Sequence, residues 1–254
     1  MASSDRFGFE WQKYRQLDPN YEIQFKKWIY PLTEKDFNGK KVLDAGCGMG
    51  RNSYWALKYG AGEVTSFDFD KRTIKSASEL LGKFKNARVE FADIYSIPYE
   101  NEFDLVFSIG VIHHLESPGI AIQNLIKAAK PGSRVLIWVY GYEGNEWIVK
   151  FVSPIRKLIT SHLPPFLLDF LAHFISIPFF ILVKSMPTKN PYTHQLKNFR
   201  FRHIHSIIFD QLLPEIANYY KKEEAKNLLL NKGLKNIEIY HCNNNSWTVI
   251  GIKQ

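Results

Sequence analysis

KVLDAGCGMGRN, residues 41–52, is the stretch that decides the fold of this chain. A short apolar run reaches Asp44 and is followed by three glycines in the spacing G-x-G-x-G, at Gly46, Gly48 and Gly50. Glycines between a buried strand and a helix let the backbone approach a nucleoside-like ligand closely. The stretch therefore predicts the first strand–loop–helix unit of a parallel α/β sheet.

Apolar strand-like runs alternate with amphipathic helical runs along most of the chain. The expected strands are 41–45, 63–69, 88–93, 103–110, 134–140, 236–241 and 246–253, and the expected helices are 51–59, 71–84, 119–130 and 221–233. The polar turn CNNN separates the last two strands and suits a hairpin. We predict a doubly wound, seven-stranded, mostly parallel Rossmann-like sheet with a C-terminal antiparallel hairpin and a helical insertion after the fifth strand.

The alternation breaks between about residues 141 and 219, where the chain is punctuated by prolines and strongly apolar. We therefore expect a single domain made of four segments. These are an N-terminal helical or lid segment (1–37), a ligand-binding core (38–140), a helical lid insertion (141–219) and the end of the core sheet (220–254).

Composition sets broad limits on the function. The 254 residues are 45% apolar and 23% charged, which is typical of a globular chain. Two cysteines in unrelated contexts form no disulfide or zinc pattern and fit a reducing compartment, and the charged N-terminus is unlike a signal peptide, so we expect a cytoplasmic location. The net charge of +8 permits contact with nucleic acid or an anionic membrane without establishing either.

The glycine loop itself narrows the ligand. Its spacing differs from the G-x-G-x-x-G of dinucleotide folds, and the chain has no G-x-x-x-x-G-K-[ST] phosphate loop. Asp44 directly before the loop would repel a pyrophosphate but suits an amino group, and Asp68 at the end of the second strand suits ribose hydroxyls. S-adenosylmethionine has a ribose, a positive charge and no phosphate, so we predict it as the cofactor.

The ordered motifs of residues 38–140 resemble the class I S-adenosylmethionine-dependent methyltransferases that act on small molecules. The similarity is carried by VLDAGCGMGR, VTSFDFD, FADIYSIPY, FDLVFSIGVIHHL and AAKPGS, where Ser133 departs from the usual second glycine. The resemblance implies that Asp44 meets the methionine amino group, directly or through water. It implies that Gly46, Cys47 and Gly48 lie close to the cofactor and that Asp68 binds the ribose.

The same resemblance assigns the adenine and methionine ends of the cofactor. Phe69 would pack on the adenine, Asp93 would accept a hydrogen bond from its exocyclic amine, and Ile94 would offer a backbone N–H. Ile109 and Gly110 would line the methionine end.

Methyl transfer from a sulfonium is an in-line displacement, so catalysis is mostly alignment plus removal of a proton where the acceptor needs it. His113 and His114 follow the fourth strand, at the edge of the sheet where ligands of α/β folds bind. Because neighbours on an extended backbone point to opposite sides, we favour His113 as the residue that faces the site. The alternative is that both histidines pack or cap the following turn.

Five further residues are candidates for substrate binding. Tyr14 lies in an aromatic N-terminal segment that could fold over the cofactor, although core packing explains it equally well. Arg200, Arg202, His203 and His205 lie in a stretch without acids, and the i, i+2 spacing of the two histidines would place them on one face of a strand. We expect no metal, since no acid or cysteine is near them in sequence.

Residues 163–183 are nearly long enough and apolar enough to cross a bilayer. Three prolines, Asp169 and His173 interrupt them, which predicts a helical piece of about a dozen residues, more typical of a core or interfacial helix than of a membrane span. On that helix Asp169, His173 and Ser176 would form a narrow polar stripe. The segment is either a lid packed on the sheet or an apolar lid for an apolar substrate, reached at a membrane surface.

We therefore expect a methyltransferase that acts on a small apolar or anionic molecule, with oxygen as the favoured acceptor atom. An RNA methyltransferase is the first alternative, favoured by the pI of about 9.3 but lacking a recognisable RNA-binding module. A non-catalytic S-adenosylmethionine-binding regulatory or assembly protein is the second. The partner is a small molecule rather than nucleic acid, membrane or lipid contact stays open, and the oligomeric state is not determined by the sequence.

Overall fold

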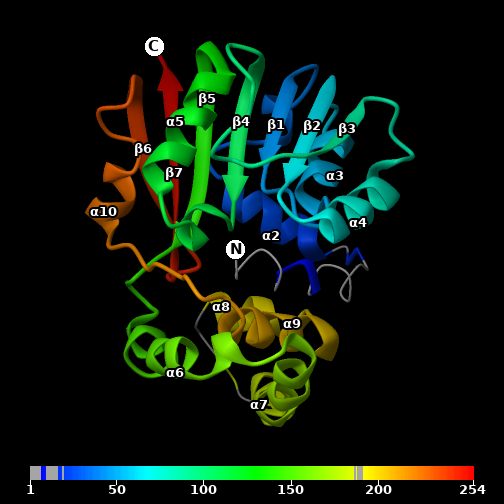
Figure 1. The fold of residues 1–254 in the computed structure, drawn as a ribbon, viewed down its shortest axis with the longest axis vertical. Helices are drawn as coiled ribbons and strands as arrows, with labels where there is room; N and C mark the ends of the chain where they lie inside the picture. Colours follow the sequence, from blue (N-terminus) through cyan, green and yellow to red (C-terminus); the bar gives the residue numbers. More distant parts are fainter. Residues whose placement is uncertain (1–6, 10–16, 19, 186, 188–190) are drawn as a thin grey trace.

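The computed structural model describes residues 7–9, 17–18, 20–185, 187 and 191–254. Its sheet has seven strands in the order β3-β2-β1-β4-β5-β7-β6 (Figure 1). The first five strands run parallel, and β7 is inserted antiparallel between β5 and β6. The bounds are β1 Lys41–Ala45, β2 Glu63–Asp68, β3 Ala87–Phe91, β4 Phe103–Ile109, β5 Ala129–Tyr140, β6 Leu234–Cys242 and β7 Ser246–Lys253. The predicted fold class is confirmed.

Helices cover both faces of this sheet, as the apolar strands require. One core lies between the sheet and the side that carries α2 (Asn20–Ile29), α3 (Arg51–Lys58) and α4 (Lys71–Leu81). The other lies under α5 (Pro118–Ala128) and α10 (Lys222–Asn227). The strands β1 and β4 in the centre are almost fully buried, which explains why their sequences are continuously apolar.

The predicted C-terminal hairpin is present, but the predicted helix at 221–233 is shorter than expected. Asn243 and Asn244 have φ of 52° and 59°, so the β6–β7 turn uses the left-handed backbone that asparagine tolerates. Helix α10 stops at Asn227, and Asn231 and Gly233 also have positive φ, which ends the helical pattern before the strand.

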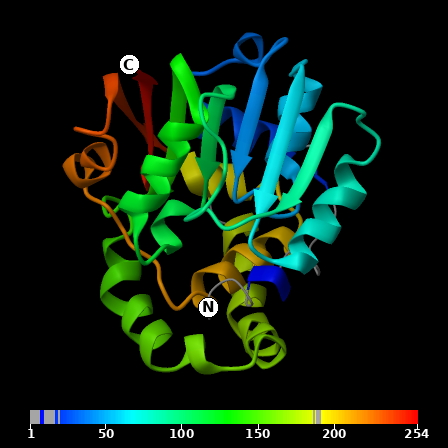
Figure 2. The same ribbon diagram turned by 45° about the horizontal axis from the view of Figure 1, so that its top comes forward.

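The segment that joins β5 to α10 in the sequence forms a helical lid, which lies beyond the carboxyl edge of the sheet (Figures 1 and 2). It contains a π-helical turn (Ile148–Val152), α6 (Ser153–Leu158), a 3-10 turn (Thr160–His162), α7 (Pro165–Ser185), α8 (Pro191–Leu196) and α9 (Phe201–Leu212). Its two ends meet where Gly141 pairs with Tyr220, and Tyr220 N–H donates to Tyr140 O at 3.0 Å. The lid is therefore tied to the tip of β5.

The prediction of a short, proline-broken helix in the lid is wrong: α7 is one helix of 21 residues with Pro178 inside it. Proline removes the N–H that would bond the carbonyl four residues earlier, at Phe174. Phe174 is 67% exposed, so this gap in the helical hydrogen bonding falls on the outer side of the helix. The packed side of α7, with buried Leu168, Ala172 and Ser176, continues unbroken.

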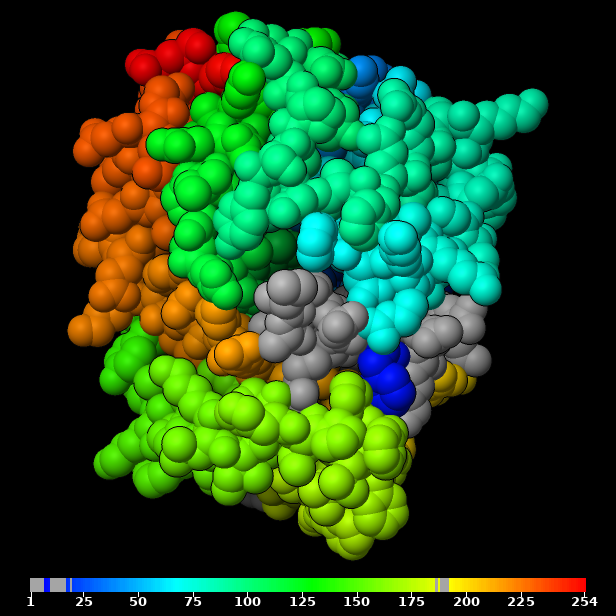
Figure 3. Space-filling view, viewed as in Figure 1, coloured from blue at the N-terminus to red at the C-terminus, as the bar shows by residue number. Residues whose placement is uncertain are grey.

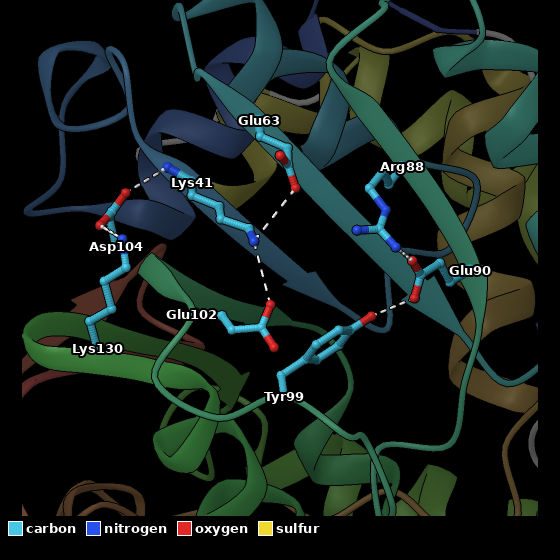
Figure 4. A network of polar contacts seen from close by, with 8 residues as sticks. All are labelled: Lys41, Glu63, Arg88, Glu90, Tyr99, Glu102, Asp104 and Lys130. Carbon is cyan, nitrogen blue, oxygen red and sulfur yellow. Dashed lines mark hydrogen bonds and ion pairs between the residues drawn. The ribbon is translucent and has the colours of Figure 1, made fainter.

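Pairs of charged side chains lie at the amino ends of the strands, at the edge of the sheet opposite the lid (Figure 4). Lys41 Nζ lies 3.4 Å from Glu102 and 3.9 Å from Glu63, and Asp104 accepts hydrogen bonds from Lys41 N–H and Lys130 Nζ. Burial alone would raise the pKa of Asp104, but the bonds from Lys130 and Lys41 hold it below its ordinary value.

Candidate active site

A cavity of about 680 Å³ lies between the carboxyl ends of the strands and the lid. Its walls come from the loop after β1, the ends of β2, β4 and β5, and the helices α2, α7 and α9. The size is that of a site for a cofactor-sized ligand, and the location is where open α/β sheets bind ligands.

The loop after β1 has the backbone that the glycine spacing predicted. Gly46 has a φ of +74°, and its N–H and that of Cys47 both donate to Phe67 O at 2.9 Å. A Cβ at Gly46 would lie 2.3 Å from Val111 Cγ2, so only glycine fits. Gly46, Cys47 and Gly48 line the cavity, and they leave their backbone open to close approach.

Asp44 lies behind this loop rather than on the cavity wall. It is fully buried, and Ser53 Oγ donates to its Oδ2 at 2.5 Å, whereas its Oδ1 has no hydrogen-bond partner. Burial raises the pKa of Asp44 to about 7. A buried, unpartnered carboxylate oxygen fits a cationic amino group reached through water, so the water-mediated form of the prediction agrees better with the geometry than direct contact does.

Asp68 lines the cavity and is held by the backbone around it. Its Oδ2 accepts from Gly48 N–H at 3.0 Å and its Oδ1 from Asp70 N–H at 3.1 Å. Burial raises the pKa of Asp68 to about 6, against the lowering effect of these hydrogen bonds. Each oxygen keeps a lone pair that can accept from a ribose hydroxyl.

The remaining predicted cofactor residues also line the cavity. Phe69 stacks on Phe91 with ring centroids 5.5 Å apart, and both rings are about half exposed, which offers an aromatic surface beside Asp68. Asp93 accepts from Tyr95 N–H at 2.9 Å. The others are Ile94, Ile109 and Gly110.

A Cβ added at Gly110, whose φ is +82°, would meet nothing within 4 Å. The residues present therefore fit a bound nucleoside with a methionine-like tail, since they combine an open glycine backbone, an aromatic platform and unpartnered carboxylate oxygen.

The structure places His114, and not His113, on the cavity wall. Residues 112–114 form a 3-10 turn instead of an extended segment, so the argument from alternating side chains does not apply. His113 is fully buried with its ring stacked 3.8 Å from that of Tyr140. His114 Nδ1 is 2.7 Å from Ile216 O, which fixes a proton on Nδ1 and leaves Nε2 as an acceptor, and burial lowers the pKa of His114 to about 4.

His203 and His205 lie on helix α9, so the predicted strand is wrong. Side chains that are two residues apart on a helix point to nearly opposite sides. His203 therefore lines the cavity, whereas His205 faces α7. The apolar residues of this stretch recur with a helical rather than a two-residue period, so the sequence pattern itself favours a helix. Arg200 and Arg202 are exposed outside the cavity wall, so their predicted role in substrate binding is not supported by their position. Tyr14 lies outside the described residues.

His205 belongs to a buried polar cluster between α7 and α9. His205 Nδ1 is 2.7 Å from Ser176 Oγ and its Nε2 is 3.3 Å from Asp169 Oδ1. Asp169, His173 and His205 offer three ligand atoms within 4.8 Å of one another, so the fold supplies the acid that the sequence lacked nearby. The cluster explains the predicted polar stripe as a contact that fixes α7 on α9, and the absence of a metal stays a prediction.

Sequence reasoning missed Asp210, which lines the cavity from the end of α9. Tyr140 Oη donates to Asp210 Oδ2 at 3.1 Å, and burial raises the pKa of Tyr140 well above its ordinary value. Phe7, whose ring lies 4.8 Å from that of His114, also lines the cavity. Asp210 is the acid that ends an acid-free stretch, and this isolation was its signal in the sequence.

The sheet order, the glycine loop and the two carboxylates at the ends of β1 and β2 are the features expected of class I S-adenosylmethionine-dependent methyltransferases. Residues 36–145 match the family described as "Methyltransferase domain". These residues therefore carry a class I methyltransferase domain, as the motifs predicted, and S-adenosylmethionine is the cofactor that this domain implies.

Similar proteins agree in fold and domain but differ in substrate. A tRNA U34 carboxymethyltransferase of Idiomarina loihiensis is 32% identical over 119 residues, which are 45% of this chain and 37% of that protein. A Ubiquinone biosynthesis O-methyltransferase of Thiobacillus denitrificans is 30% identical over 149 residues, 55% of this chain and 64% of that protein.

A crystal structure of magnesium protoporphyrin IX methyltransferase from Synechocystis, with bound S-adenosylhomocysteine, matches with a TM-score of 0.59 at 14% identity and covers 99% of this chain and 98% of that one. At this identity the structural match establishes the fold alone. The chain spans less than two thirds of the length of both curated relatives, so they do not settle its substrate.

Proposed function

We propose that the protein transfers the methyl group of S-adenosylmethionine to an oxygen of an apolar small molecule held under the lid. The observation that carries the proposal is the composition of the cavity wall. Most of the exposed area of the wall is apolar, and beyond the cofactor residues it includes Trp138, Tyr140, Ile148, Phe179 and Tyr192, with polar side chains such as Asn145 and Asp210 among them. Such a wall recognises an apolar body with a few polar groups.

Three residues of this wall carry a buried polar atom without a hydrogen-bond partner among the described residues: Gln24 Oε1, Trp138 Nε1 and His203 Nε2. Burial, and then the charge of Arg51, lower the pKa of His203 to about 3, so its ring is neutral at physiological pH. A hydroxyl on the acceptor can pair with such an atom, whereas leaving one unpaired costs about 1–3 kcal/mol.

The cofactor supplies an activated methyl group on sulfur. The chain's part is to hold the acceptor in line, to exclude water with the lid and to receive a hydrogen bond or proton from the acceptor hydroxyl. His114 Nε2 is suited to accept that hydrogen bond because its ring is held neutral with Nδ1–H bonded to Ile216 O, but its lowered pKa of about 4 disfavours uptake of the proton. Asp210, across the same cavity, is the second candidate.

The proposal is tested with tritium-labelled S-adenosylmethionine and a panel of hydroxylated aromatic and long-chain compounds, with matched carboxylic acids as the comparison. Alkali-stable label in the hydroxyl compounds is expected, and label that alkali releases would indicate methyl esters and an anionic acceptor. Tight binding of S-adenosylhomocysteine without transfer to any acceptor would favour the non-catalytic alternative.

RNA is the second candidate substrate, favoured by the similarity to a tRNA U34 carboxymethyltransferase and by the positive charge of the lid. Unmodified tRNA in the same assay decides it: RNA-bound label that disappears steeply as salt is raised would replace the small-molecule proposal. The cytoplasmic location stays a prediction.

A further inference from the structure

The outer surface of the lid is apolar on helix α7. Large apolar side chains recur along its outer side: Phe166, Phe170, Phe174 and Ile181 are 69%, 60%, 67% and 61% exposed, respectively. The opposite side of α7 is buried against α9 through Leu168, Ala172 and Ser176 and the polar cluster with His205. Helix α7 therefore buries its polar side chains against α9 and exposes large apolar side chains on its outer side.

A second apolar stripe comes from the π-helical turn and α6. Trp147, Phe151, Ile155 and Leu158 recur at helical spacing and are 59%, 59%, 51% and 78% exposed. The helices that carry most of both stripes, α6 and α7, lie at the end of the molecule farthest from the sheet (Figures 1 and 3). Together these eight residues are called the apolar face. Monomeric soluble proteins rarely expose a patch of this kind unless it binds something.

The charge around the apolar face narrows the choice of partner. Residues 147–209 contain eight Lys and Arg against one acid, Asp169, a net charge of +7 in a chain whose total is +8. That acid is buried, whereas Lys150, Lys157 and Lys184 are exposed beside the apolar residues. Apolar side chains surrounded by cations match the surface of an anionic lipid bilayer, where rings enter the acyl boundary and ammonium groups meet headgroups.

The face fits a position at the membrane surface better than a crossing. Helix α7 is long and apolar enough to span a bilayer by length and composition. Spanning would strip Asp169 and Ser176 from His205 and leave a buried acid in hydrocarbon, which is costly. With α7 lying flat, the polar cluster stays packed on α9 and only the apolar face meets lipid.

The cavity opens onto this face. Trp147 and Ile175 are 59% and 51% exposed, and both also line the cavity. Val152 and Phe179, from the same two elements, line it too. An apolar molecule leaving a bilayer under the lid would therefore reach the cavity along apolar side chains.

We propose that the apolar face docks on the surface of an anionic lipid bilayer and that the cavity receives its apolar methyl acceptor from there. Docking stands on the lid alone, whereas the route of the acceptor rests on the proposed function.

Vesicle flotation of the full chain tests docking. Vesicles of phosphatidylcholine with about 30% phosphatidylglycerol are expected to carry the protein up the gradient, and binding should weaken as salt is raised. Phe170→Asp with Phe174→Asp should reduce the partition coefficient more than tenfold, since each ring loses its burial in lipid. Lys150→Glu with Lys157→Glu should reduce it at least 25-fold, since each lysine contributes roughly fivefold.

Ile120→Asp is the matched control, because Ile120 is 50% exposed on α5, far from the lid in sequence, and should leave partition unchanged. Calorimetric binding of S-adenosylhomocysteine verifies that each variant is folded and separates the two proposals. Absence of flotation with intact cofactor binding overturns docking and leaves the proposed function standing. Equal binding to pure phosphatidylcholine overturns the role of charge, and a dimer in sedimentation that Phe170→Asp dissociates, without vesicle binding, assigns the face to a second copy.

Trp147 provides a readout at a single position. In a Trp11→Phe background, brominated lipids should quench mainly Trp147, because the other tryptophans of the described residues are at most 9% exposed. Loss of this quenching in Trp147→Phe, with flotation retained, supports docking through the apolar face. Quenching that persists in Trp147→Phe overturns the proposed orientation.

Discussion

Asp44→Asn is expected to act in opposite directions on stability and on cofactor binding. Burial raises the pKa of Asp44 from 3.8 to about 7, so the unfolded chain binds fewer protons at this group than the folded chain between those two values. Stability therefore falls as pH rises through that window. For these two pKa values the loss between pH 5 and pH 8 is about 2.5 kcal/mol.

In Asp44→Asn this loss disappears, because an amide does not ionise. Urea unfolding of the cofactor-free protein at pH 5 and pH 8 measures this loss of unfolding free energy. Comparing the change between the two pH values in wild type and variant cancels any pH-independent cost of the amide. Asp68, whose pKa burial also raises, is present in both proteins and is largely subtracted. Parallel pH dependences of wild type and variant would show that Asp44 is not a buried, ionising carboxyl.

Cofactor binding supplies the second half of this prediction. An ammonium reached from Asp44 Oδ1 favours the ionised carboxylate, so S-adenosylhomocysteine should stabilise the wild type more at pH 8 than at pH 6. Asp44→Asn should lose roughly tenfold or more in affinity for S-adenosylhomocysteine, by calorimetry, but nothing for adenosine, which lacks the amino group. Equal losses for both ligands would refute the assignment.

Three further changes test the rest of the site. Asp68→Asn should weaken adenosine and S-adenosylhomocysteine alike, by about 1.5–3 kcal/mol for a lost charge-assisted bond, and an effect confined to S-adenosylhomocysteine would contradict ribose binding. Phe69→Ala should cost about 1–3 kcal/mol of adenosine affinity in the same titration, with Ile23→Ala, another half-exposed apolar residue, as the control. Gly46→Ala should lower the unfolding free energy by about 2 kcal/mol or more, since its Cβ would meet Val111, and an unchanged melting temperature would mean that the loop is not fixed as described.

The core could be predicted because its signals are local. The turn between β6 and β7 is fixed by asparagines that tolerate positive φ, and the loop after β1 by a glycine that no other residue can replace. The order of the carboxylates along the sheet then follows from the rule that parallel strands end at one edge. The sequence of residues 41–110 therefore predicts both the fold and the location of the cofactor cavity.

The lid could not be predicted as well, because its structure depends on contacts between segments distant in sequence. The i, i+2 spacing predicts that His205 shares a face with His203, but the contacts of His205 are with Asp169 and Ser176 on another helix. His113 and His114 exchange their expected roles because the backbone after β4 turns into a 3-10 helix. Neither a helix-to-helix hydrogen bond nor a single tight turn leaves a periodic trace in one sequence.

The same reasoning separates what fixes the methyl donor from what selects the acceptor. Donor recognition uses short loops at the ends of β1, β2 and β4, where one residue such as Asp68 performs one task. In the proposed function, acceptor recognition uses the inner side of a lid whose outer side is apolar and basic, so changes on α7 are expected to act either on membrane docking or on what enters the cavity. Phe179 faces the cavity and Phe174 faces outward on the same helix, five residues apart. Phe179→Ala should therefore change the KM of an acceptor presented in solution without changing vesicle binding, and Phe174→Ala should weaken vesicle binding without changing that KM.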